Sequence, residues 1–162
     1  MKLIADLELL LTQQIAEHRK LLAFCDAQQT AMKAFNLKVM EDLTHLTEAC
    51  RMRIATSENK RKTLTLLINK ALKLPNDAKL PQIADAAPQF KPSLTKLRDE
   101  LKDVMAQIQK RNFVAGKVAG AVLGHLNTVV RLIAGAVEKA GLYTKQGIPK
   151  VSARIGVMEA IG

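Results

Sequence analysis

The sequence predicts an all-α fold, an elongated antiparallel bundle of three long helices, and three observations lead to this prediction. The composition is rich in the helix formers Leu, Ala, Lys and Gln, whereas aromatic residues make up 3%. Apolar side chains recur at spacings of three and four residues along most of the chain. Four of the five prolines fall within residues 75–92, which predicts a linker between helices.

The first helix is expected over residues 2–34, because one apolar stripe runs along that whole stretch. Its members are spaced about 3.5 residues apart, the period of a coiled-coil seam. His18 and Gln29 are the polar members, and such residues commonly fix the register of a seam. The predicted stripe is Ile4, Leu7, Leu11, Ile15, His18, Leu22, Cys25, Gln29 and Met32.

The second helix is expected over residues 38–74, after a turn at 35–37 in which Asn36 caps the helix. Two apolar stripes run along it, separated by the polar residues 55–63. That polar stretch is either solvent-exposed helix or a point where the helix bends. The stripes are Val39, Leu43, Leu46, Cys50 and Ile54, then Leu64, Leu67, Ile68 and Leu72.

The linker 75–92 should pack over the bundle through Leu80, Ile83 and Phe90, with one short helical turn. The third helix should begin at Ser93 as N-cap and run to Ala140, a length of roughly 70 Å. A rod of that length favours binding over catalysis. Residues 1–144 therefore form the helical domain, and residues 145–162 form a tail that orders only against a partner.

Three glycines recur every four residues on one face of the third helix: Gly116, Gly120 and Gly124. Each glycine costs about 1 kcal/mol relative to alanine in a helix interior. Three in register predict that another backbone packs closely against this face, either within the bundle or from a partner helix.

Catalytic and metal-binding patterns are missing from the sequence. His18, His45 and His125 stand alone, and Asp42 with His45 supplies a single copy of a motif that di-metal bundles need twice. The sequence has no glycine-rich phosphate loop and no paired-cysteine zinc spacing. Cys25 and Cys50 occupy apolar-periodic positions, as buried thiols in a reducing cytoplasm do. We therefore predict no enzyme activity, no cofactor and no metal.

The net charge of +10 is unevenly distributed, because residues 51–73 carry seven Lys and Arg against Glu58 alone. Such a face suits nucleic acid, an acidic membrane surface or an acidic protein, or it is simply a solvated face. Residues 113–137 are the most apolar but contain Lys117 and Arg131, which argues against membrane insertion. The N-terminus lacks the apolar core of a signal peptide. A soluble, cytoplasmic protein is expected.

Three local sequences resemble those of the FlgN flagellar export chaperones, as does the plan of two long helices, a Pro-containing linker and a longer third helix. Residues 80–84 (LPQIA) resemble the linker segment before the long helix. Residues 109–112 (QKRN) resemble an Asn-x-x-Asn signature, with Gln109 in place of the first asparagine. Residues 142–147 (LYTKQG) resemble a Tyr-x-x-x-Gly exit into the tail. The strong positive charge departs from the acidic character of many type III export chaperones.

The resemblance implies a chaperone without ATPase activity. It would bind the C-terminal helical segment of hook–filament junction proteins (FlgK and FlgL types), prevent their premature assembly and deliver them to a FlhA-type export gate. Tyr143 is the implied gate-docking residue, and the alternative is an ordinary helix-end anchor. The apolar end of the third helix is the candidate client surface, and the alternative is intramolecular core. That surface comprises Val122, Leu126, Val129, Val130, Ile133, Val137 and Leu142.

Two other functions stay open at this stage. A basic nucleic-acid-associated helical protein would use residues 51–73, but no aromatic residue is interleaved with that charge for base stacking. A structural coiled-coil adaptor would self-associate without a client, so a homo-oligomer is left open.

Overall fold

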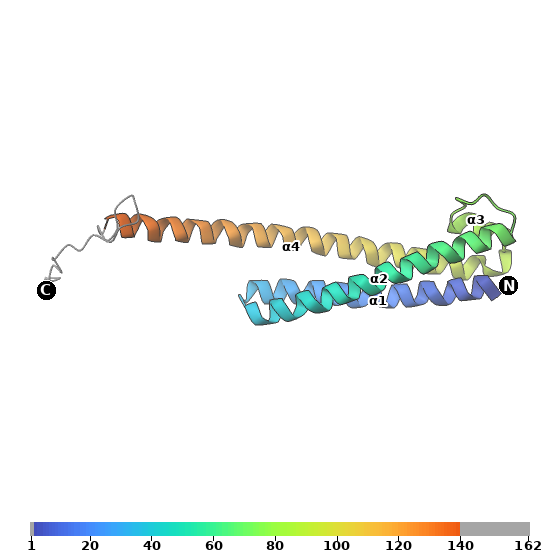
Figure 1. Ribbon diagram of the computed structural model, residues 1–162, viewed down its shortest axis with the longest axis horizontal. Helices are drawn as coiled ribbons and strands as arrows, with labels where there is room; N and C mark the ends of the chain where they lie inside the picture. Colours follow the sequence, from blue (N-terminus) through green and yellow to red (C-terminus); the bar gives the residue numbers. More distant parts are fainter. Residues whose placement is uncertain (1, 140–162) are drawn as a thin grey trace, which may run out of the picture. The chain divides into compact units, whose positions relative to one another are not determined.

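The computed structural model describes the backbone of residues 2–139 and the side chains up to residue 136. It contains the α-helices α1 (Lys2–Lys33), α2 (Leu37–Ala71), α3 (Leu80–Ala86) and α4 (Lys91–Lys139), with a 3₁₀ turn η1 (Pro88–Phe90) (Figure 1). No strand occurs among the described residues, so the all-α prediction is confirmed. The prediction of three helices is wrong, because the linker folds into α3 and η1 rather than one short turn. The chain divides into two compact units at Val118–Ala119.

Within the first unit, α1 and α2 lie side by side and run in opposite directions (Figure 1). Glu17 of α1 pairs with Arg53 of α2 at 2.9 Å. Three residues earlier in α1, the Gln14 side chain donates to Glu58, which lies later in α2. Because the pairs progress in opposite senses along the two helices, the hairpin is antiparallel.

The first part of α4 runs parallel to α1. Arg19 pairs with Glu100 at 3.3 Å, and Gln29 donates to the Arg111 carbonyl at 2.9 Å. Both members of these pairs advance together along the chain. The first part of α4 therefore runs in the same direction as α1. The chain reverses direction between α2 and α4, in the segment that contains α3.

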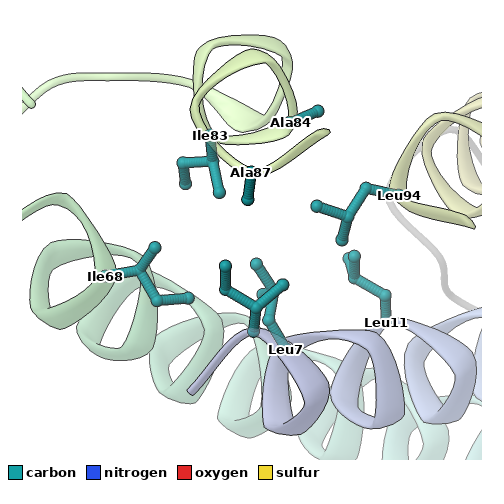
Figure 2. Close-up of a cluster of buried hydrophobic side chains, with 8 residues drawn as sticks. Leu7, Leu11, Ile68, Ile83, Ala84, Ala87 and Leu94 are labelled. Atoms are coloured by element: carbon teal, nitrogen blue, oxygen red, sulfur yellow. The ribbon is translucent and has the colours of Figure 1, made fainter. Parts of the chain in front are cut away.

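One cluster of buried apolar side chains joins all four helices near the N-terminus of the chain. Figure 2 shows side chains from α1, α2, α3 and α4 that converge on one volume. α3 has seven residues, too few for an isolated helix to be stable, and Ile83 is the fully buried side chain that holds it in place. The labelled cluster is Leu7, Leu11, Ile68, Ile83, Ala84, Ala87 and Leu94.

A second buried cluster holds both cysteines. Cys25 and Cys50 are free and buried, and they lie with Leu21, Val104 and Ile108. Burial raises the pKa of both thiols above the ordinary value. The predicted burial of the two thiols is confirmed.

The buried face of α2 differs from its predicted apolar stripes. Three predicted members, Val39, Leu46 and Leu67, are exposed. The positions turned inward instead include Thr47 and Asn69, which are polar and fully or nearly buried. The predicted members Leu43, Cys50 and Ile68 are buried, so the prediction is right at these positions. Leu46 is exposed and Thr47, the next residue, is buried in its place.

α2 is one continuous helix through residues 55–63, which answers the question that the sequence left open. Glu58 faces inward there, where Arg61 donates to it at 2.7 and 2.8 Å and Gln14 at 3.3 Å. These hydrogen bonds, with that of Arg61 first in size, lower the pKa of Glu58. A polar network thus replaces apolar packing along this part of the interface.

The helix ends agree with the sequence in part. Asn36 caps α2 by accepting the Val39 N–H at 3.2 Å, as predicted. α4 begins at Lys91 rather than at Ser93, because Pro92 occupies the first turn, where its missing N–H is not needed. Instead of capping, the Ser93 hydroxyl lies between two acceptors for its one proton, the Phe90 carbonyl and the Glu8 carboxylate.

Replacing Asn69 by alanine is expected to destabilise the fold by about 2 kcal/mol. The Asn69 side chain is fully buried, and its amide donates to the carbonyls of Asn76 at 3.2 Å and Ala78 at 3.0 Å. Truncation leaves both carbonyls without this donor in the loop before α3. Urea denaturation followed by circular dichroism measures the change, with Asn59→Ala on the exposed side of α2 as control. Equal midpoints for the two variants would contradict the structural role.

Candidate partner-binding surfaces

Apolar side chains recur at helical spacing in the α4 residues of both units. Leu94, Val104 and Ile108 are buried members of this stripe. At about 100° per residue, Leu126 lies in the same direction from the helix axis as Ile108, and Ile133 lies about 20° away. In the sequence, the later apolar residues therefore keep the helical spacing of the earlier ones.

In the second unit this stripe is exposed to solvent. Leu126 is 51% and Ile133 59% exposed, and Val129 and Val130 are also exposed, whereas Val122 is partly buried. Isolated exposed apolar residues are normal on a protein surface, but a contiguous set on one helix face marks an interaction site. Leu126, Val129, Val130 and Ile133 are thus not packed as core against other described residues.

Two exposed leucines of the same segment were missed by the sequence analysis. Leu123 lies about 60° from Leu126 around the axis and widens the stripe, and Leu132 lies about 120° away. Both are plainly apolar in the sequence. They were left out because the predicted surface followed one stripe at spacings of three and four residues, and these two leucines lie to either side of it. The Val137 side chain, Leu142 and Tyr143 lie outside the described residues.

The three glycines of α4 meet open space. A Cβ atom built at Gly116, Gly120 or Gly124 has no atom within 4 Å beyond its chain neighbours and the nearby backbone of its own helix. The described residues therefore place no neighbouring backbone against this face. Close approach of a partner helix stays a prediction.

Contacts between α1 and α4 extend to the segment 109–112, whose two amide residues are Gln109 and Asn112. Asn112 accepts from the Cys25 thiol at 3.4 Å, and Arg111 pairs with Asp26 at 2.6 Å. Gln109 is exposed. Asn112, rather than Gln109, is the amide of the pair that contacts α1.

The described residues hold no group of three or more His, Cys, Asp or Glu side chains suited to a metal ion. Asp42 and His45 are both exposed on α2. His18 lies close to the Gln14 carbonyl, 2.7 Å from its Nδ1. The described histidines thus make no metal or catalytic constellation with one another.

Glu17 is the most strongly perturbed carboxyl group of the described chain. Hydrogen bonds from Lys20 at 2.6 Å and Arg53 at 2.9 Å lower the pKa of Glu17 from 4.5 to about 2. The pair with Arg53 joins α1 to α2, so the charge of Glu17 contributes to the hairpin.

Stability should fall as the pH drops from about 5 to about 2, because the folded-state pKa of Glu17 lies below its unfolded value. The stabilisation from ionised Glu17 is fully present above the unfolded-state pKa. It is lost as the pH falls through the folded-state pKa of about 2. Glu17→Gln should remove about 1 kcal/mol at pH 7 and flatten this part of the curve. Urea midpoints measured across this pH range test the prediction, with Glu48→Gln, at an exposed carboxyl group of α2, as control. A Glu17→Gln curve parallel to that of the unmodified chain would contradict it.

The helical stretch Pro88–Ala136 is long and apolar enough to cross a membrane, judged by length and composition alone. Its most apolar window has a mean hydropathy of 1.4 and is unburied. The same exposure is what a helix that binds another protein requires.

An all-α chain with an exposed apolar stripe on the later part of its longest described helix has the features of a helical protein-binding protein. Residues 1–150 match the family model described as FlgN protein. The chain therefore belongs to the FlgN family of flagellar export chaperones, whose general role is the binding of flagellar hook-associated proteins. No curated protein and no solved structure is significantly similar to the chain.

Proposed function

We propose that the chain binds the C-terminal helical segment of a FlgK- or FlgL-type hook–filament junction protein in the cytoplasm. Binding prevents premature assembly of that protein and needs no ATPase activity, and delivery to a FlhA-type export gate follows. The observation that supports this proposal best is the exposure of the α4 stripe at Leu126 and Ile133.

The physical basis is helix-in-groove recognition. An amphipathic client helix has an apolar face that stays in water until the client assembles, and the α4 stripe offers a complementary face. Burying a leucine, isoleucine or valine side chain contributes about 1.5–3 kcal/mol before the cost of association. The five described members of the stripe therefore supply enough apolar surface for a specific complex.

The glycine face gives a second means of contact. Open space surrounds Gly116, Gly120 and Gly124, so a partner helix is able to approach the α4 backbone closely there. Gly120 and Gly124 lie about 120° and 160° from Leu126 around the axis, so a helix on this face would be a contact separate from the client stripe.

The direct test is a calorimetric titration of the full chain with the C-terminal segment of the FlgK-type protein from the same organism. A saturable 1:1 complex is expected. Titration without heat or saturation, together with no change in the circular dichroism of the segment, would overturn the proposal. A segment of equal length from the middle of the same client serves as control.

Tyr143→Ala is expected to leave client affinity unchanged and to reduce export of the client by tenfold or more, since the proposal assigns Tyr143 to the gate rather than to the client. Secretion of the junction protein and motility of a complemented strain measure the effect. Tyr143→Phe separates the hydroxyl from the ring. Loss of client affinity in Tyr143→Ala would instead make Tyr143 an anchor of the client surface.

A further inference from the structure

A second apolar groove runs along the seam between α1 and α2. It consists of two adjoining hollows of about 660 and 350 Å³, which share Leu10, Gln13, Thr56 and Lys60. The residues that line both hollows come from α1 and α2 alone, and no described residue of α4 is among them. This seam groove is therefore a surface separate from the α4 stripe.

Leucine side chains from both helices line the seam groove. Leu9 and Leu10 of α1 and Leu64 and Leu67 of α2 line the larger hollow. Leu9 is 60% and Leu67 49% exposed. These side chains stand opposite one another across a seam that lacks a third helix, which is the arrangement into which an additional helix packs.

The charges around the seam groove are mostly positive. Lys60 lines both hollows, and Arg53 lines the smaller one. Lys70 lies within about 40° of the direction of Thr56 around the α2 axis and so shares the groove face. Arg53 is paired with Glu17, but among the described residues neither Lys60 nor Lys70 forms an ion pair. Asp6 is the one acidic residue that lines either hollow.

We propose that the seam groove binds an amphipathic helix of a partner protein in which Asp and Glu flank the apolar stripe. The leucines of the groove pack against that stripe, and Lys60 and Lys70 face the partner's carboxylates. The α2 positions that line it, 52–67, extend about 22 Å, which a partner helix of about 15 residues covers. This inference does not depend on the client of the α4 stripe.

The same features disfavour other occupants. Nucleic acid places its phosphates on a basic surface. The leucines that line this groove offer no aromatic side chains on which its bases could stack. Two copies that met groove to groove would place Lys60 and Lys70 of each copy near those of the other, and like charges at an interface are unfavourable. An amphipathic helix flanked by Asp and Glu can pack against the leucines of the groove and pair with the lysines at its edge.

The probe is a designed Leu-striped helix of about 18 residues whose stripe is flanked by Glu, compared with the same peptide flanked by Lys. The protein is the full chain carrying Leu126→Asp with Ile133→Asp, which removes apolar binding at α4. Fluorescence anisotropy gives the affinity, and hydrogen–deuterium exchange locates the contact. The Glu-flanked peptide should bind at least about tenfold more tightly than the Lys-flanked one. It should also protect residues 5–13 and 56–67.

Variants of the seam groove make the test specific. Leu9→Asp with Leu67→Asp should weaken the Glu-flanked peptide by about 50-fold or more, and Lys60→Glu by about fivefold. Leu46→Asp adds a charge at an equally exposed leucine of α2 outside the groove and should change nothing. Thermal unfolding checks that every variant folds.

Several outcomes would overturn the inference. They are equal affinity for the two peptides, protection outside the seam, and loss of binding in Leu46→Asp. Self-association that protects the seam without peptide would assign the groove to a second copy. Salt-dependent duplex binding that protects residues 56–67 would assign it to nucleic acid.

Discussion

Aspartate at both Leu126 and Ile133 is expected to weaken binding of the client segment by about 100-fold or more, equivalent to about 3 kcal/mol. Both side chains are exposed in the free protein, so the substitutions cost little there. In the complex, each aspartate would lose its hydration against an apolar client face. The measurement is a titration of the client segment into the variant, and helicity by circular dichroism should stay close to that of the unmodified chain.

The matched control adds the same two carboxylates at Asn127 and Thr128. Both residues are exposed on α4, and both lie at least about 100° from Leu126 around the axis. Client affinity of this control should stay within about twofold of the unmodified chain. Unfolding of the Leu126/Ile133 variant would move those residues into the core, and unchanged affinity would remove them from the client surface.

Leu7→Ala is expected to destabilise the protein by about 3 kcal/mol. Leu7 is fully buried in the cluster that joins the four helices, next to Ile68, Ile83 and Leu94 (Figure 2). Truncation leaves a cavity between helices that are already in contact and cannot close fully around it. Urea denaturation should show a lower midpoint with an unchanged dependence of the unfolding free energy on urea concentration.

Leu9→Ala is the matched control for Leu7→Ala, since the same chemical change occurs two residues away on the same helix. Leu9 is 60% exposed, so its truncation should cost less than about 0.5 kcal/mol. Similar losses for both variants would mean that the buried cluster does not carry the stability assigned to it.

The seam of α1 and the length of α4 were predictable because apolar spacing and the absence of interior prolines are local properties. Leu7, Leu11 and Cys25 proved buried as predicted, and Asn36 caps α2 as predicted. The chemical reason is that a cap or an apolar stripe acts through neighbours within one or two helical turns.

The true inward face of α2 was not predictable in the same way. Glu58 and Arg61 are polar, and their inward placement depends on the presence of Gln14 across the interface. The pairing of a residue on α1 with one 44 positions later is a tertiary fact. The extent of α3 was underestimated: one short helical turn packed through Ile83 was expected, whereas seven residues are helical, stabilised by the burial of Ile83 rather than by helix propensity.

The functional surfaces likewise depend partly on local sequence patterns and partly on tertiary packing. The sequence alone marked Leu126, Val129 and Ile133 as one apolar stripe on a helix that extends without a break, because periodicity defines a face. Whether that face is core or free surface depends on which other helices reach it. In the folded chain, Leu126, Val129 and Ile133 are exposed. The seam groove was invisible to periodicity, since two separate helices form it and Leu67 entered the sequence analysis as a core residue. Local spacing determines which side chains share a face, and only packing determines which faces are left uncovered.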